Sequence, residues 1–441
     1  MMTESYGPRA MVGSRAVLPL APSVFGELAL AAALLLLWTP CLGMILNVPS
    51  QYPTIQAAIT AAAQQGDEVV VADGTYTGPG NAGIYLEGKE VTVRSQSGIP
   101  STCTIDGQFT RGAVVCFQQG EDSRCVLEGF TITGGADVGI NNGGGIYVQG
   151  ASPTIRNCII TDNQGGDPSG YPGHGGGINI WGASSPDISD CVITLNWAAW
   201  YHGQPSYGGG VYSESHTAVL RNCTLTDNRA GYGGGFFGNG TFIDCTIRDN
   251  VAESADSYGG VGGGINAQAA SLLGCVIAGN EAGLSGGGLG GSATVEGCTI
   301  AGNRCGGNQD FGGGGGGLAI DAGSSLTLTI VCGNCSSYRG DDILAGGNPV
   351  LICCCVDPSK IDGMVTFDGP QINQDPLFCD PEPCASAPTL GGDYRLQDTS
   401  PCLPSAHPCG SNSLVGALSQ GCSGPVPTEQ TTWGRLKARF R

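Results

Sequence analysis

Apolar and polar residues alternate in a short segment that recurs along the chain. In one copy Cys158 and Ile160 fall on one side of an extended backbone, while Asn157 and Ile159 fall on the other. Six copies contain the cysteine, and they read NCIITDN (157–163), DCVITLN (190–196), NCTLTDN (222–228), DCTIRDN (244–250), GCVIAGN (274–280) and GCTIAGN (297–303). Two degenerate copies flank them, GFTITGG (129–135) and LTIVCGN (328–334). We predict a β-strand in each copy, with the cysteine side facing a core.

Three glycines precede each cysteine-containing copy. The triplets begin at Gly143, Gly175, Gly208, Gly233, Gly262 and Gly286. From the first glycine to the asparagine that ends the copy, the offsets are 20, 21, 20, 17, 18 and 17 residues, whereas 4 to 11 residues separate each asparagine from the next triplet. Coils of nearly constant length, with loops of variable length at one corner, indicate a parallel β-solenoid.

Stacking of such coils places equivalent residues in columns. The cysteines at 158, 191, 223, 245, 275 and 298 form an inward column of free thiols, because cysteine packs well as a small apolar group. The asparagines that end the copies form a second column at a corner. Asparagine tolerates the left-handed backbone of a tight corner, and stacked amides hydrogen-bond along the axis. Glycine permits positive φ at the other corner.

Three stretches resemble known β-helix proteins. VPSQYPTIQAAITAAAQQGDEVVVADGTYTG (48–78) is similar to the first coil of secreted right-handed parallel β-helix proteins of the pectate-lyase-like superfamily. In these an amphipathic helix covers the open end of the core, which implies an apolar face of Ile55, Ala58, Ile59 and Ala62 here. The glycine and cysteine rows resemble the repeats of chlamydial polymorphic outer-membrane proteins, and residues 375–402 resemble the closing segment of secreted β-helix proteins. The resemblance covers about residues 48–422 and implies an all-β, right-handed parallel β-helix, a fold that hosts many functions.

Four regions are expected. Residues 1–43 are read as a secretory signal peptide, because the eleven-residue apolar run 28–38 is too short to span a membrane and small residues follow it at Cys41 and Gly43. A lipoprotein anchor at Cys41 is the alternative. The β-helix would occupy 44–348, a Cys-rich, disulfide-bonded C-terminal cap 349–422, and a linker with a basic tail 423–441. Twenty cysteines after Gly43 suit an exported protein, so we expect a secreted or cell-surface location and no transmembrane span in the mature chain.

Charge and cysteine spacing restrict the partners and cofactors. The net charge of −19 repels phosphate backbones, which argues against nucleic acid, and it disfavours acidic polysaccharides unless a divalent cation bridges the two. Cys332 and Cys335 have zinc-like spacing, but disulfides are the preferred reading for an exported chain. Calcium could bind acidic loop positions such as Asp167, Asp256 or Asp341, although none carries a recognisable loop signature. We therefore expect no cofactor.

No catalytic set can be assembled from the sequence. Polygalacturonases, which are similar in fold, carry Asn-Thr-Asp, Asp-Asp, Gly-His-Gly and Arg-Ile-Lys in that order. This chain has Gly173-His174-Gly175 before Asp341-Asp342, Arg435-Leu436-Lys437 near its end, and no Asn-Thr-Asp. Nor is there the paired carboxylate motif beside a base that a calcium-dependent lyase needs. We interpret His174 as a corner residue.

Two neighbouring loops of eleven residues, 164–174 and 197–207, are rich in rings. They leave the same corner on adjacent coils and offer Tyr171, His174, Trp197, Trp200, Tyr201, His202 and Tyr207. His174, Tyr207, Tyr232 and Phe311 each immediately precede a glycine triplet, which predicts an aromatic column. Exposed rings beside polar groups suit sugar stacking, so we expect non-catalytic binding of a polysaccharide or a cell-surface component. The alternatives are rings that merely cover the corner of a structural surface protein, and a carbohydrate-active enzyme, a lyase or a glycoside hydrolase, with an unrecognised active site.

Overall fold

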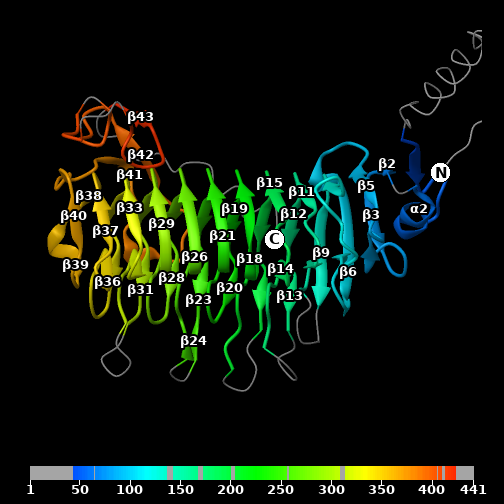
Figure 1. Ribbon diagram of the computed structural model, residues 1–441, viewed down its shortest axis with the longest axis horizontal. Coiled ribbons are helices and arrows are strands. Elements are labelled where there is room, and N and C mark those ends of the chain that lie inside the picture. Colours follow the sequence, from blue (N-terminus) through cyan, green and yellow to red (C-terminus); the bar gives the residue numbers. More distant parts are fainter. Residues whose placement is uncertain are drawn as a thin grey trace, which may run out of the picture. The chain divides into compact units, whose positions relative to one another are not determined.

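Parallel strands of successive coils lie side by side through most of the structure (Figure 1). The computed structural model describes residues 43–423 except 64, 137–142, 167–171, 200–203, 256–257, 308–312, 405 and 410–412. The expected leader and tail therefore lie almost wholly outside the described residues. In the two large sheets every strand pairing is parallel and joins one coil to the next, as the repeat predicts.

Four runs of strands make up the coils. The first run is β4 (Ile84–Tyr85), β7 (Val115–Phe117), β10 (Ile146–Gln149), β14 (Ile178–Trp181), β18 (Val211–Arg221), β21 (Phe236–Ile243), β26 (Ile265–Leu273), β29 (Leu289–Glu296), β32 (Leu318–Asp321), β36 (Ile343–Gly346) and β39 (Ile361–Asp362). The second run comprises the later halves of β18, β21, β26 and β29 with β1 (Ile45–Val48), β2 (Gln65–Val71), β5 (Glu90–Ser95), β8 (Val126–Glu128), β11 (Thr154–Arg156), β15 (Asp187–Ser189), β33 (Ser325–Thr327), β37 (Val350–Ile352) and β40 (Thr366–Asp368). These two runs share one sheet.

The other two runs share the second large sheet. The third is β3 (Gly74–Thr77), β6 (Cys103–Arg111), β9 (Thr131–Ala136), β12 (Ile159–Thr161), β16 (Val192–Thr194), β19 (Thr224–Thr226), β22 (Thr246–Arg248), β27 (Val276–Ala278), β30 (Thr299–Ala301), β34 (Ile330–Cys332) and β38 (Cys355–Val356). The fourth is β13 (Gln164–Gly165), β17 (Trp197–Ala198), β20 (Arg229–Ala230), β23 (Val251–Ala252), β28 (Glu281–Ala282), β31 (Arg304–Cys305) and β35 (Cys335–Ser336). A small hairpin, β24 (Ser254–Ala255) with β25 (Tyr258–Gly259), lies outside both sheets.

The inward column of cysteines is present as predicted. Cys158, Cys191, Cys223, Cys245, Cys275 and Cys298 are each at most 1% exposed, and none of them is in a disulfide. Ile160 and Ile193, which lie two residues after Cys158 and Cys191, pair with each other in register and are fully buried. Burial raises the pKa of the Cys191 thiol, so this thiol stays protonated.

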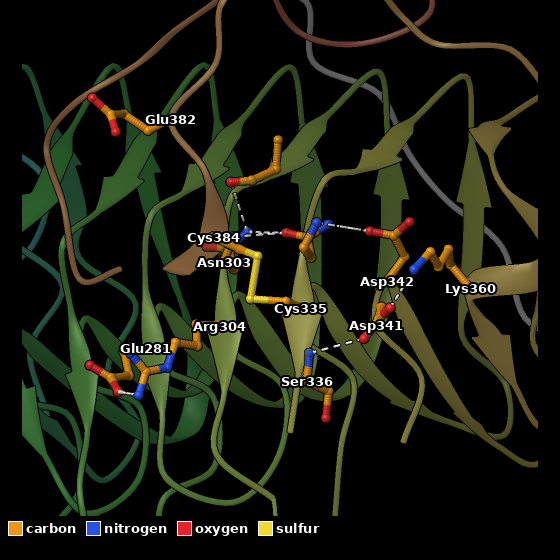
Figure 2. Close-up of a disulfide and its surroundings, with 12 residues drawn as sticks. Glu281, Asn303, Arg304, Cys335, Ser336, Asp341, Asp342, Lys360, Glu382 and Cys384 are labelled. Carbon is orange, nitrogen blue, oxygen red and sulfur yellow. Dashed lines mark hydrogen bonds and ion pairs between the residues drawn. A yellow bond between two sulfur atoms is a disulfide. The ribbon is translucent and has the colours of Figure 1, made fainter. Parts of the chain in front are cut away.

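The asparagine column is a continuous ladder of side-chain hydrogen bonds. Asn196 Nδ2 donates to Asn228 Oδ1 at 3.0 Å, and the same bond links every step from Asn163 to Asn334. The ladder ends on a carboxylate, because Asn334 donates to Asp342 Oδ1 from its backbone N at 3.0 Å and from Nδ2 at 2.9 Å (Figure 2).

The prediction that the asparagines themselves adopt the left-handed backbone of this corner is wrong. The left-handed residue is the one before the asparagine, as at Asp162 (φ 53°), Asp227 (φ 56°) and Asp249 (φ 56°). The asparagines are instead selected for their amides, which satisfy buried polar groups from one coil to the next. The glycine corner behaves as predicted: Gly208 has φ 63°, and a Cβ on Gly210 would lie 2.6 Å from the carbonyl oxygen of Gly235.

A short helix packs at the N-terminal end of the core, as the resemblance implies. Helix α2 (Ile55–Ala61) buries Ile55, Ala58 and Ile59 completely, and Ala62 directly follows it at 6% exposure. Thr54 accepts a hydrogen bond from the N–H of Ala57 at 3.2 Å, which caps the first turn. At the other end Lys89 Nζ donates to the carbonyls of Ile59 at 2.7 Å and Thr60 at 2.8 Å.

The Cys-rich C-terminal region lies along the flank of the stack instead of across its last coil. Parallel pairing continues to β39 and β40, beyond residue 349, at which the cap was expected to begin. After β40 the chain turns back along the stack, and we call the described part of residues 369–423 the returning segment. It forms a three-stranded sheet of β41 (Phe378–Asp380), β42 (Asp393–Gln397) and β43 (Gln420–Cys422). Phe378, Tyr394 and Leu396 share an apolar cluster with the outward residues Val276, Ala278 and Ala301 of β27 and β30. The outer faces of these strands are apolar, and the returning segment buries them.

Three disulfides fix this region within the described residues. They are Cys335–Cys384 (Figure 2), Cys353–Cys409 and Cys379–Cys422. Cys335 therefore bonds to the returning segment and does not act with Cys332 as a zinc pair. No helix in the described part of the chain has the length and apolar character needed to cross a bilayer.

Candidate functional site

Three of the seven residues expected to bind a ligand are described, namely His174, Trp197 and Tyr207. Tyr171, Trp200, Tyr201 and His202 lie outside the described residues, as does Phe311 of the expected column. His174 and Tyr207 are brought together, while Trp197 lies apart from them. The site is therefore built from the first two and from the rings that they contact.

The first column of rings runs across three coils directly before the glycine triplets. His174 bridges in parallel to Tyr207, and Tyr207 to Tyr232. The His174 and Tyr207 rings stack with centroids 5.3 Å apart at 14°, and Tyr207 and Tyr232 stack at 5.3 Å and 9°. The next steps of the same column are Val261, Ser285 and Gly314, so among the described residues its aromatic part is confined to these coils.

A second column lies beside the first on the outer face of β14, β18 and β21. Trp181 stacks on Tyr212 at 6.0 Å and 16°, and Tyr212 on Phe237 at 5.6 Å and 3°. The columns meet edge to face, with His174 4.8 Å from Tyr212 and Tyr207 4.8 Å from Phe237. We call these six rings the double aromatic column. Parallel stacking within a column and edge contact between columns are both favourable geometries for rings.

The second column was missed from the sequence, although a signal for it exists. The residue after each triplet faces the core, so the one following it faces outward. In the coils of β18 and β21 that outward residue is Tyr212 or Phe237, and both pair in register. Reading the outward positions across coils, and not only the loops, would have found them.

Three polar atoms beside the rings, two on Asn179 and one on His174, have no hydrogen-bond partner. Asn179 lies in register between Tyr147 and Tyr212, is fully buried, and has neither an acceptor for Nδ2 nor a donor for Oδ1 in the structure. His174 Nδ1 is likewise buried and without a partner. Burial lowers the pKa of His174 to about 4, so the imidazole is neutral above that pH. Each buried polar group without a hydrogen bond lowers the stability of the fold by about 1–3 kcal/mol.

Trp197 occupies a different strand run. It lies on β17 between Gln164 and Arg229 in register and is 37% exposed. Arg229 lies 3.4 Å from Glu253, which makes this neighbourhood polar and charged. Among the described residues no ring contact joins Trp197 to His174 or Tyr207.

The residues that resembled catalytic motifs have structural partners. Asp341 accepts from Lys360 Nζ at 2.5 Å, and Asp342 is buried at the end of the asparagine ladder (Figure 2). The carboxylate of Asp341, one of the three suggested calcium ligands, is thus engaged by a lysine. Asp167 and Asp256, and the Arg435–Lys437 segment, lie outside the described residues.

Comparison with known proteins agrees with this architecture. Residues 82–271 match a family model described as a right handed beta helix region. Similar solved structures include pectate lyase Pel9A, with 14% identity over 86% of this chain and 97% of the other at a TM-score of 0.48. They also include a pectin methylesterase from carrot, with 9% identity, coverage of 75% and 90%, and a TM-score of 0.35. No curated protein matches the chain. The parallel pairing of its coils makes the fold a parallel β-helix, and residues 82–271 match the right-handed form of that fold.

Proposed function

We propose that this β-helix is a secreted or cell-surface protein that binds a neutral glycan, without cleaving it, on the double aromatic column. The observation that carries the proposal is a set of outward rings stacked across three adjacent coils, next to the buried atoms of Asn179 and His174 that have no hydrogen-bond partner. Three disulfides among the described residues support the location, because such bonds persist in oxidising compartments.

The rings offer the apolar part of a sugar site. Trp181, Tyr207, Tyr232 and Phe237 are half-buried, so each keeps part of its surface available. Sugar rings present C–H faces that pack on aromatic faces and hydroxyls that need hydrogen bonds. A repeating glycan suits a surface whose rings repeat from one coil to the next.

The polar groups offer the part that orients a sugar. Asn179 supplies both a donor and an acceptor, and Nδ1 of the neutral His174 supplies a further polar atom. Because Asn179 is fully buried, a ligand hydroxyl reaches its amide only when neighbouring side chains move, and that bond then removes the cost of leaving the amide unbonded. The net charge of −19 favours a neutral polymer over an acidic one.

Retention on neutral polysaccharides in native affinity gels tests the proposal. The Tyr207→Ala/Tyr232→Ala double variant should lose at least tenfold in affinity, about 1.4 kcal/mol. Tyr338→Ala is the matched control, because Tyr338 is 43% exposed and lies far along the stack, beside β35. Equal retention by the double variant and the control would contradict the site, and release of new sugar ends would contradict the non-catalytic function.

Asn179→Leu separates a binding role from a structural one. Replacing an unbonded buried amide by an apolar group of similar size should raise stability by about 1 kcal/mol or more. Binding should fall in the same variant, because the donor and acceptor are gone. A variant that is more stable and binds unchanged would show that Asn179 does not touch the ligand.

A further inference from the structure

A second cluster of donor atoms lies away from the rings, where the returning C-terminal segment meets β37. Cys353 follows β37, and Cys409 and His407 belong to the returning segment. The Sγ atoms of both cysteines and a ring nitrogen of His407 all lie within 4.8 Å of one another. Cys353 is 6% exposed and His407 9%, while Cys409 is half-buried. In the structure the two cysteines form a disulfide.

One ring nitrogen of His407 is held by a backbone carbonyl. His407 Nε2 lies 2.7 Å from the carbonyl oxygen of Ser413, and since a carbonyl only accepts, Nε2 carries the proton. Nδ1 then has a free lone pair, and this buried atom has no hydrogen-bond partner. A disulfide makes no use of such a lone pair. A metal ligand does, and a histidine that binds metal usually donates its other N–H to a carbonyl in this manner.

We propose that the reduced form of this cluster is a zinc site in which Cys353 and Cys409 bind through Sγ and His407 through Nδ1. Two thiolates and one imidazole are a donor set that suits Zn²⁺. In a tetrahedral site such donors lie about 3.6–3.8 Å apart, a spacing that the cluster accommodates once the sulfurs are no longer bonded to each other. The half-buried position of Cys409 leaves the fourth coordination position for water.

Zinc and the disulfide exclude each other. Reduction takes two electrons and two protons, supplied by two equivalents of a monothiol that leave as their own disulfide, and gives two Cys–SH groups. Zn²⁺ then displaces both thiol protons, whereas His407 binds through its lone pair and keeps the proton on Nε2. The +2 charge of the ion is balanced by the two thiolates. Oxidation by the reverse route releases the ion.

The other disulfides provide the contrast. Among the described residues, neither Cys335–Cys384 nor Cys379–Cys422 belongs to a group of three such donors. Cys355 and Cys402 lie in thiol contact nearby, and the contact raises the pKa of Cys355. They are the competing place for zinc, so the experiment must resolve individual cysteines.

Site-resolved alkylation tests the inference. The whole protein is reduced with a monothiol, desalted without air, and alkylated with iodoacetamide in the presence or absence of one equivalent of Zn²⁺. Peptide mass spectrometry should then show that Zn²⁺ slows the modification of Cys353 and Cys409 at least tenfold in the unaltered protein. The absence of protection at these two residues would overturn the inference without the need for any variant.

Variants locate the third ligand. His407→Ala should bind Zn²⁺ at least tenfold more weakly and lose the protection, while Cys402→Ser should retain both. Melting of the oxidised His407→Ala protein, whose disulfide does not depend on the imidazole, checks that it folds. Protection that survives His407→Ala or disappears in Cys402→Ser would place zinc elsewhere and overturn the assignment.

Discussion

At the scale of single residues, the end of the asparagine ladder differs from its interior. Every inner amide receives a bond at Oδ1 and donates from Nδ2, whereas the last acceptor is the carboxylate of Asp342, 3% exposed. Burial raises the pKa of Asp342 to about 6, and the two hydrogen bonds from Asn334 offset only part of that effect. The folded protein therefore holds this proton more tightly than the unfolded chain does.

The raised pKa gives a pH-dependent prediction for Asp342→Asn. The carboxyl group favours the folded state fully below its ordinary pKa of 3.8, and this contribution is lost as pH rises through about 6. An amide keeps the acceptor for Asn334 and never ionises. The variant should gain at most about 3 kcal/mol over the parent at pH 8 and little at pH 4, measured by urea unfolding at both values.

Asp341→Asn is the matched control for that change. Its hydrogen bond from Lys360 lowers the pKa of Asp341, so ionisation stabilises the fold and the variant should be slightly less stable at pH 8. The pair is partly exposed, which limits the loss to about 0–1 kcal/mol. The two adjacent aspartates should thus respond with opposite signs. A gain for both would mean that general charge reduction, and not the burial of Asp342, governs the result.

At the scale of elements, helix α2 depends on a lysine that is distant in sequence. Lys89 is 8% exposed, donates to the carbonyls of Ile59 and Thr60, and lies 3.1 Å from Glu87. Its ammonium group donates to carbonyls at the end of the helix, and a positive charge there interacts favourably with the helix dipole.

Lys89→Met should therefore loosen the helix. The methionine stem fills similar space but removes the ammonium group from both carbonyls and from Glu87, at a cost of about 2–3 kcal/mol. Hydrogen exchange at the amides of the last turn of α2 should become faster, and the melting temperature should fall. Lys360→Met, which removes an exposed cation paired with Asp341, should change stability by no more than about 1 kcal/mol. Equal losses in both variants would contradict a specific role for Lys89.

The limits of sequence reasoning also appear at this scale. Alternation and constant coil length are local properties, and they were enough to predict the strands and the cysteine column. The rings of His174, Tyr207 and Tyr232 could be aligned for the same reason. The apolar face of α2 was implied by the resemblance of residues 48–78 to known β-helix proteins. Asp342 could not be found, because it leads into β36 and reaches Asn334 only through the stacking of coils. The site around His407 depends on where the returning segment lies, which no repeat encodes.

At the scale of the whole described fold, glycines decide where the returning segment packs. In four coils the left-handed corner residue is Asp162, Leu195, Asp227 or Asp249. In the next two coils it is Gly279 or Gly302, and the returning segment lies directly against both. Thr389 N donates to the carbonyl of Gly279 at 2.8 Å, and a Cβ on Gly302 would collide with the Tyr394 hydroxyl. These positions lack a side chain because Tyr394 and its neighbours take that space.

Gly302→Asp should therefore displace the segment while leaving the coils intact. Aspartate is accepted at φ values near that of Gly302 (65°), as Asp227 and Asp249 show, so any loss comes from the collision and not from backbone strain. Gly297→Asp is the matched control, because φ is 59° there and nothing lies within 4 Å of the added Cβ. The first variant should lose about 1–3 kcal/mol and show faster hydrogen exchange in β42, while the second should stay within about 0.5 kcal/mol of the parent. The Cys335–Cys384 disulfide still tethers the returning segment in Gly302→Asp. If exchange in β42 of this variant is as slow as in the parent, the disulfides alone hold the segment against the stack.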